Sequence, residues 1–162
     1  MENNKYVKLH SFFRMAAALI AVIVFIAMFI AKQIVHESFE GAFFTWNEAF
    51  FGDSAINTNG TIVGFIGYLF IIIGGLAGLA FVFIDDVIDS DLVKKLSFVA
   101  GGLIILGAVM TLLTGILFRV FNPDLVDRNS FRLAAGPIVF GVLAILAGAA
   151  NIAAPILEDK GL

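Results

Sequence analysis

The sequence predicts an all-α membrane protein, a bundle of four transmembrane helices with a short interfacial helix or hairpin in the first external loop. Hydrophobic residues make up 60% of the 162 residues and charged residues only 14%, whereas typical soluble domains have roughly 45–50% and about 25%. The mean hydropathy is +1.02. We therefore expect residues 1–162 to form one membrane domain.

Four apolar runs account for this excess, and they predict spans at 13–32, 62–84, 96–118 and 133–157. At a rise of 1.5 Å per residue, a run such as 62–84 covers about 35 Å, which is enough to cross a hydrocarbon core of about 30 Å. The first run is the shortest because Arg14 and Lys32 flank its uncharged part. We expect both side chains to extend toward the membrane interfaces.

The basic residues predict the orientation. Six of the ten Lys and Arg residues lie in the N-terminal segment, the 85–95 loop and the C-terminal tail, and four lie on the other side. Because cytoplasmic segments carry the excess of basic residues, both termini and the 85–95 loop are expected in the cytoplasm of a cell with this protein in its cytoplasmic membrane. The loops at 33–61 and 119–132 are then external.

Small residues recur at helical spacing in two spans. Such residues let helices approach closely in lipid, where no hydrophobic drive brings them together. We interpret both stripes as packing faces within the bundle, while a dimerisation or partner-docking face remains open. Large residues such as Phe65, Phe70, Ile73 and Phe81 are expected to face lipid. The predicted helix-packing residues are Gly60, Gly64, Gly67, Gly74 and Gly78 in the second span, and Gly141, Ala144, Gly148 and Asn151 in the fourth, where Pro137 and Pro155 continue the stripe.

The deepest polar residues in the spans are Tyr68, Thr111, Thr114 and Asn151. Threonine hydroxyls in helices commonly bond to a carbonyl of the preceding turn. Asn151 lies on the small-residue stripe, so we expect its amide to find a hydrogen-bond partner there. These four residues are also the ones that would line a path for a solute.

Several chemistries lack the residues they need. The chain has no cysteine, which excludes disulfides, thiolate metal sites and thiol redox chemistry. His10 and His36 are expected on opposite sides of the membrane, so they cannot bind one metal together. A net charge of −3 gives no sign of nucleic-acid binding. We expect no catalytic set, no metal site and no cofactor, and we interpret the protein as a non-enzyme.

The first external loop is rich in aromatic residues. Positions 39, 42, 43, 46, 49 and 50 follow the i, i+3, i+4, i+7 pattern of an amphipathic helix. We expect a short helix that lies on the outer leaflet or caps the bundle, with a β-hairpin as the alternative because aromatic residues also favour strands. The candidate contacts for a partner or interface are Phe39, Phe43, Trp46 and Phe50.

The other two loops give weaker signals. Asp85, Asp86, Asp89 and Asp91 lie within seven residues, and capping of the third helix by Ser90 or Asp91 is favoured over cation binding. The Asn-Pro-Asp segment at 122–124 predicts a turn in the second external loop.

The order of four helices with a long aromatic first external loop resembles the claudin-like tetraspan plan. The chain lacks the paired cysteines of that family and retains only Trp46 of its loop signature. It also resembles small uncharacterised bacterial four-helix membrane proteins in the segments AFFG at 49–52 and AAGPI at 134–138 and in the lysine pair Lys94 and Lys95. The resemblance implies a topology and no catalytic activity.

These observations favour a scaffold or accessory subunit that acts through helix packing and its aromatic external loop. Its expected partners are the lipid bilayer and either further copies of itself or another membrane protein. A channel or facilitator for a small neutral or lipophilic solute is the alternative.

Overall fold

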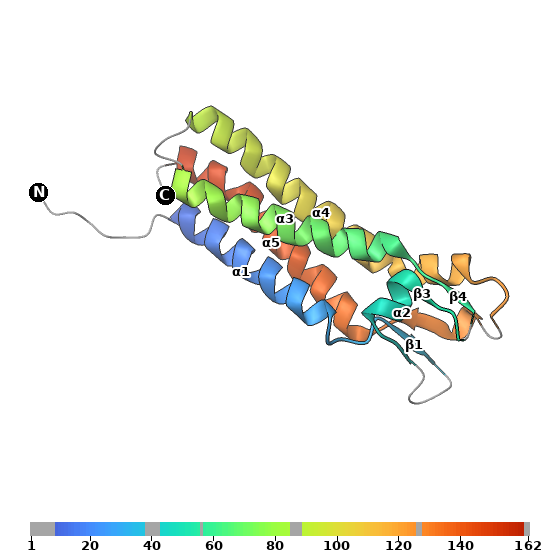
Figure 1. Ribbon diagram of the computed structural model, residues 1–162. Coiled ribbons are helices and arrows are strands. Elements are labelled where there is room, and N and C mark those ends of the chain that lie inside the picture. Colours follow the sequence, from blue (N-terminus) through green and yellow to red (C-terminus); the bar gives the residue numbers. More distant parts are fainter. Residues whose placement is uncertain (1–8, 38–42, 56, 85–88, 126–127, 161–162) are drawn as a thin grey trace, which may run out of the picture.

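The computed structural model describes residues 9–37, 43–55, 57–84, 89–125 and 128–160 (Figure 1). Four long helices dominate it: α1 (Leu9–Met28), α3 (Ile62–Ile84), α4 (Ser90–Phe121) and α5 (Ala135–Asp159). Each is long and apolar enough to cross a membrane. The predicted fold class is confirmed.

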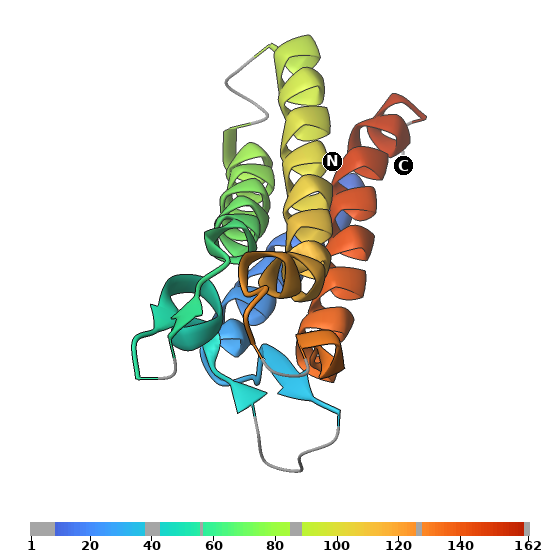
Figure 2. The same ribbon diagram turned by 90° about the vertical axis from the view of Figure 1, so that its right-hand side faces the viewer.

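The helices form a bundle in which α1 packs on α3 and α5, and α4 packs on the same two helices from the other side. Figure 2 shows α3, α4 and α5 side by side, with α1 behind them. The described start of α1 and the end of α5 lie at one end of the bundle (Figure 1), which we call the terminal end. The opposite end carries all the strands, and we call it the sheet end.

The helix bounds differ from the predicted spans in three of the four helices: α4 runs from 90 to 121 against the predicted 96–118, and α5 from 135 to 159 against 133–157. α3 covers the predicted 62–84, whereas α1 begins and ends four residues earlier than the predicted 13–32. α4 begins at Ser90 because the carboxylate of Asp89 accepts a hydrogen bond from the backbone N–H of Asp91 at 3.1 Å. The cap is therefore Asp89 and not Ser90 or Asp91. Asp85 and Asp86 lie outside the described residues.

Glycines bring helix backbones into direct contact. A Cβ atom added to Gly67 on α3 would lie 2.6 Å from the carbonyl oxygen of Gly107 on α4, and one added to Gly101 would lie 2.7 Å from that of Gly148 on α5. Such distances leave no room for any side chain. The close approach lets dispersion contacts between backbones hold α3, α4 and α5 together in lipid.

The remaining predicted packing residues also lie inside the chain's own contacts. Gly74 faces Ala100 and Ile104 of α4, and Gly141 faces Leu112. Gly60 precedes α3, where it packs on the backbone of Phe50 and Gly52 and not on a helix face. Gly64 faces Thr114 and Phe50, Gly78 faces Asn151, and Ala144 is fully buried.

Two of the residues expected to face lipid do not, or do so only in part. Phe65 is half-buried, and its ring packs against those of Phe50 and Phe51. Phe81 is only 8% exposed because it packs with Val93 and Ala100 of α4. Phe81 lies on the same helical stripe of α3 as Gly74 and Gly78, so its side chain faces α4. Ile73 is 53% exposed, as expected.

The described residues of the two loops expected to be external, 33–61 and 119–132, together build the sheet end. Strands β1 (Ile34–His36), β2 (Phe43–Phe44) and β5 (Phe131–Leu133) form an antiparallel sheet in the order β2-β1-β5. Between them in sequence lie α2 (Trp46–Phe51) and the strand pair β3 (Gly52–Asp53) and β4 (Thr58–Asn59). A short 3-10 helix, Arg128–Ser130, leads into β5.

The helix expected in the first external loop is shorter than its sequence pattern indicates. It begins at Trp46 because the backbone N–H of Thr45 donates to the carboxylate of Glu48 at 2.7 Å, which starts the helix there. Phe43 and Phe44 pair with β1 instead. Helix and hairpin, the two alternatives, therefore both occur, one after the other.

Alanine substitutions at two glycines of the bundle test the close backbone contact. We expect Gly67→Ala to lower the free energy of unfolding by about 1–3 kcal/mol, because its Cβ has no space beside Gly107. Gly102 has nothing within 4 Å of an added Cβ, so Gly102→Ala is the matched control and should be neutral or slightly stabilising. Thermal unfolding in mild detergent measures both, and equal losses would contradict the contact.

Candidate functional site

Gln33 is the polar centre of the sheet end. Its side chain is 1% exposed and lies just after α1. Its amide nitrogen donates to the carbonyl oxygens of Met28 and Ala31 at 3.0 and 3.3 Å, and its amide oxygen accepts from the hydroxyl of Tyr68 at 3.3 Å. The last carbonyls of a helix have no partner within it. Gln33 therefore satisfies the end of α1 and connects it to α3.

Backbone hydrogen bonds extend the sheet on both sides of Gln33. Its N–H donates to the carbonyl of Phe44, and its own carbonyl accepts from Ala134, both at 2.9 Å. At the other end of β1, the N–H of Glu37 donates to the carbonyl of Ser130 at 2.9 Å. Residues 33–37, after the first span, are thus bonded to residues 130–134, before the last span.

Aromatic rings fill the space between this sheet and the bundle. Phe44 of β2 lies 4.9 Å from Phe118 of α4 and 5.7 Å from Phe131 of β5, measured between ring centroids. Trp46 of α2 lies 5.0 Å from Phe29, which follows α1. Tilted and edge-to-face ring pairs at these distances are favourable. The aromatic residues of the first loop are therefore mainly a core for the sheet end.

Only part of the predicted contact set is on the surface. Phe43 is 42% exposed, whereas Trp46 is half-buried and Phe50 is 1% exposed. Phe39 lies outside the described residues. Phe51, which the helical pattern did not select, is 51% exposed. The apolar face that the pattern identifies packs against the protein's own bundle, where α2 buries Ala49 and Phe50, so the expected helix caps the bundle.

An asparagine pair joins the two loops of the sheet end a second time. The side chain of Asn122, at the end of α4, accepts from the N–H of Asn59 at 2.6 Å and donates to its carbonyl at 2.9 Å. In return the side chain of Asn59 donates to the carbonyl of Phe121 at 2.9 Å. These bonds fix β4 to α4, and the Asn-Pro-Asp turn begins at this contact.

The threonines behave as expected. The hydroxyl of Thr111 donates to the carbonyl of Gly107 at 3.0 Å, and that of Thr114 donates to Met110 at 3.4 Å. Both bonds lie within α4. The two hydroxyls are therefore occupied by their own helix.

Asn151 does not find the partner expected for it. Its side chain is fully buried against Gly78, and neither of its amide atoms has a hydrogen-bond partner in the part of the chain that is described. The same holds for the buried hydroxyl of Ser97. Tyr68 and Gly78 are ten residues apart on α3, which separates Tyr68 from Asn151 by about 15 Å along the bundle. The deepest polar residues are therefore not gathered at one point.

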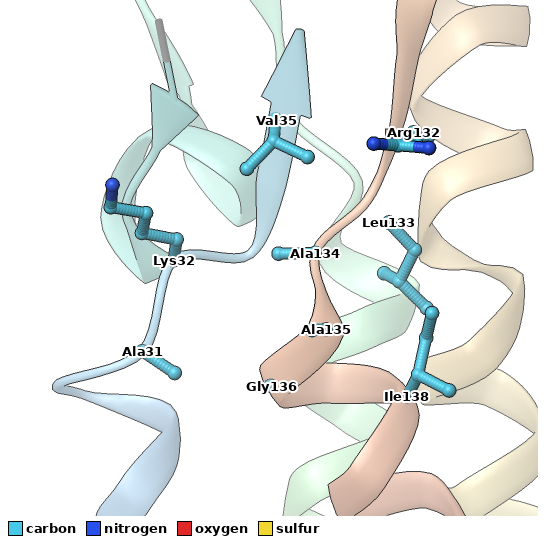
Figure 3. Close-up of a pocket in the computed structure, with 9 residues that line it drawn as sticks. All are labelled: Ala31, Lys32, Val35, Arg132, Leu133, Ala134, Ala135, Gly136 and Ile138. Atoms are coloured by element: carbon cyan, nitrogen blue, oxygen red, sulfur yellow. The ribbon is translucent and has the colours of Figure 1, made fainter. Parts of the chain in front are cut away.

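A groove opens beside the sheet, between the end of α1 and the start of α5 (Figure 3). Its volume is about 630 Å³ and its walls are mostly apolar. Lys32 and Arg132 line it, and Figure 3 shows them on either side of Val35 and Ala134. Neither basic residue was singled out as a ligand-binding residue, because the strands that bring them together lie a hundred residues apart in the chain.

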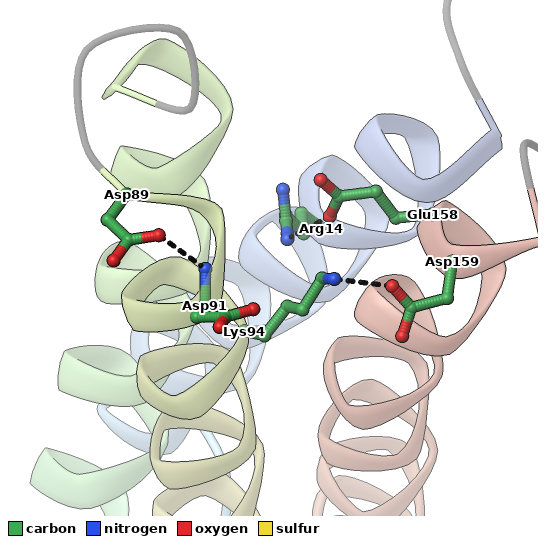
Figure 4. Close-up of polar contacts among 6 residues, drawn as sticks. All are labelled: Arg14, Asp89, Asp91, Lys94, Glu158 and Asp159. Carbon is green, nitrogen blue, oxygen red and sulfur yellow. Dashed lines mark hydrogen bonds and ion pairs between the residues drawn. The ribbon is translucent and has the colours of Figure 1, made fainter.

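Ion pairs hold the terminal end (Figure 4). Arg14 lies within α1, its side chain is fully buried, and its guanidinium is 3.2 Å from the carboxylate of Glu158 on α5. The expectation that Arg14 extends to the interface is therefore wrong. Lys94 of α4 pairs with Asp159, the residue that follows Glu158 on α5. His10 is also buried within α1, at the opposite end of the bundle from His36.

Comparisons with known proteins do not extend this description: no protein-family model, no curated protein and no solved structure was found to match the chain. The four apolar helices make the chain a multi-pass membrane protein. Among the described residues, no group of three or more His, Cys, Asp and Glu side chains is placed to hold a metal ion.

Two substitutions test the role of Gln33. We expect Gln33→Leu to lower the free energy of unfolding by about 2–3 kcal/mol, because it leaves buried carbonyls and the hydroxyl of Tyr68 without their partner. Tyr68→Phe removes one of these bonds and should cost about 1 kcal/mol. Chemical or thermal unfolding in detergent measures both changes. If Gln33→Leu lowers the free energy of unfolding no more than Tyr68→Phe does, the bonds from Gln33 to the end of α1 do not contribute to stability.

Two neighbouring residues on α5 provide a matched test of the buried ion pair. Glu158→Gln removes the carboxylate that pairs with the fully buried Arg14, so we expect a loss of about 2 kcal/mol or more in unfolding free energy. Asp159→Asn makes the same chemical change in a pair exposed to solvent and should cost clearly less. Thermal unfolding measures both variants. A larger loss for Asp159→Asn than for Glu158→Gln would contradict the stabilising role of the Arg14–Glu158 pair.

Proposed function

We propose that this protein is a non-enzymatic scaffold or accessory subunit of a bacterial cytoplasmic membrane, with both termini in the cytoplasm. The observation that carries the proposal is the sheet end. There, two external loops are joined by strand pairing, by Gln33 and by the pair of Asn59 and Asn122 into one fixed surface. A surface held by so many contacts is suited to binding, because little conformational entropy is lost when a partner docks.

Phe43 and Phe51 are the contact residues within this surface. They are 42% and 51% exposed, and large aromatic side chains are over-represented among the residues that anchor protein interfaces. The backbone of Phe43 is fixed by its pairing with β1, and the ring of Phe51 packs against the rings of Trp46 and Phe65. Both therefore present an apolar surface in a fixed orientation.

The bundle interior gives the channel alternative less support. A solute path needs polar groups that face one another along the membrane. The hydroxyls of Thr111 and Thr114 bond within α4, and that of Tyr68 bonds to Gln33. The close contacts at Gly67 and Gly107 favour a bundle that is filled along its axis.

Site-specific photocrosslinking in intact membranes tests the proposal. A benzophenone amino acid replaces Phe43 or Phe51, and Phe83 is the control because it is an even more exposed aromatic residue, 76%, at the far end of α3. We expect one discrete adduct from positions 43 and 51 and none from position 83. Mass spectrometry then identifies the adduct as a second copy or as one membrane protein.

Purification in mild detergent provides the second readout. The proposal predicts a stable homo-oligomer or a defined complex, and Phe43→Ala with Phe51→Ala should dissociate it while Phe83→Ala does not. A partner-free monomer without adducts at positions 43 and 51 would overturn the proposed function.

A further inference from the structure

We propose that the groove between the end of α1 and the start of α5 binds one phospholipid with an anionic headgroup. Lys32 and Arg132 would hold the phosphate, and the apolar walls would hold the upper part of an acyl chain. This inference concerns a lipid site. It does not rest on the proposed docking of a partner, although the groove adjoins that surface at Phe43, whose ring the Lys32 ammonium contacts.

The position of the groove indicates a lipid. It opens where α1 ends at Met28 and α5 begins at Ala135, which is where two membrane-spanning helices reach the boundary of the hydrocarbon core. Next to it, Ile30 is 84% exposed and Ile138 is 46% exposed. The lower part of the groove is therefore continuous with the apolar surface that faces acyl chains.

Small residues keep the groove open. Ala31, Ala134, Ala135 and Gly136 line it. A Cβ atom on Gly136 would lie 3.1 Å from that of Ala31, so the segment after α1 and the start of α5 approach each other closely. The backbone bond from Ala134 to the carbonyl of Gln33 fixes the two walls relative to each other. The site is thus a formed depression and not a gap between mobile segments.

The charges at the groove complement a phosphate. Lys32 lies with its ammonium 4.2 Å from the centroid of the Phe43 ring, and Arg132 pairs with Glu37 at 3.3 Å. That ion pair is weak because both side chains are more than half exposed, 63% and 51%. The described charges at the rim are therefore two basic groups and one acidic group, an arrangement that favours an anion.

The start of α5 adds to the same preference without being the site by itself. Its first turn contains no acidic residue, and its N-cap residue Ala134 makes no side-chain hydrogen bond to the helix. Exposed N–H groups at a helix start carry a partial positive charge. Ala135 and Gly136, which belong to this turn, line the groove between the two basic residues.

Native mass spectrometry of the full chain in mild detergent tests the proposal. The delipidated protein is titrated with phosphatidylglycerol and, separately, with phosphatidylcholine of the same acyl chains. We expect one phosphatidylglycerol to bind about tenfold more tightly than phosphatidylcholine, since each basic group near a headgroup adds to the attraction for anionic lipid. Equal affinities for the two lipids would overturn the proposal.

Charge variants locate the site. Lys32→Gln combined with Arg132→Gln should abolish the preference for phosphatidylglycerol. The matched control is Arg119→Gln, because Arg119 lies in the last turn of α4 at the same end of the bundle but outside the groove. We expect it to keep the preference. If Arg119→Gln loses as much as the double variant, the attraction is a general property of the surface and the groove is not a site.

Two further measurements test whether lost binding reflects a filled groove or misfolding, and whether the ligand is a lipid or a soluble phosphate compound. Ala135→Phe fills the groove without changing charge, and it should lower the affinity for phosphatidylglycerol while the variant keeps its melting temperature. Soluble glycerol phosphate supplies the headgroup without acyl chains and should bind much more weakly than the lipid. Equal binding of glycerol phosphate would assign the groove to a free phosphate compound and overturn the lipid proposal.

Discussion

The antiparallel pairing of β1 with β5 is the interaction on which the sheet end depends. Where a membrane helix ends, the backbone still needs partners for its N–H and C=O groups. The chain solves this by pairing the segment after α1 with the segment before α5, in the register Ile34 with Leu133 and His36 with Phe131. One short ladder therefore satisfies both loops and sets the distance between α1 and α5.

The other features of the sheet end follow from that pairing. Because β5 lies beside β1, Arg132 comes within the same groove as Lys32, and Phe131 reaches the rings of Phe44 and Phe118. The terminal end uses a different device, since the buried pair of Arg14 and Glu158 ties the start of α1 to the end of α5. Between the two ends, glycine contacts hold the helices. Each level of the bundle thus has its own means of stabilisation.

Sequence reasoning predicted the four helices because hydropathy is summed over every residue of a span, so single errors hardly matter. It could not predict the pairing of β1 with β5, since strands of three residues carry no periodicity and the partners are a hundred residues apart. Gln33 was missed because its role depends on a carbonyl left by the helix before it and a hydroxyl on another helix. The helical pattern identified the apolar face that carries Ala49 and Phe50, but it could not decide whether a partner or the protein's own bundle covers that face. Arg14 was misread since its partner, Glu158, is distant in sequence.

The central claim is that the two loops at the sheet end pair in one sheet, and engineered disulfides test it most directly because the chain has no cysteine of its own. Val35 and Arg132 are directly opposite in the β1–β5 ladder, a placement within disulfide reach. Val35→Cys with Arg132→Cys should therefore oxidise to a disulfide in intact membranes. Val35→Cys with Phe131→Cys is shifted by one residue and places the second thiol on the opposite face, so it should stay reduced. Equal oxidation of the two variants, or none in either, would contradict the account.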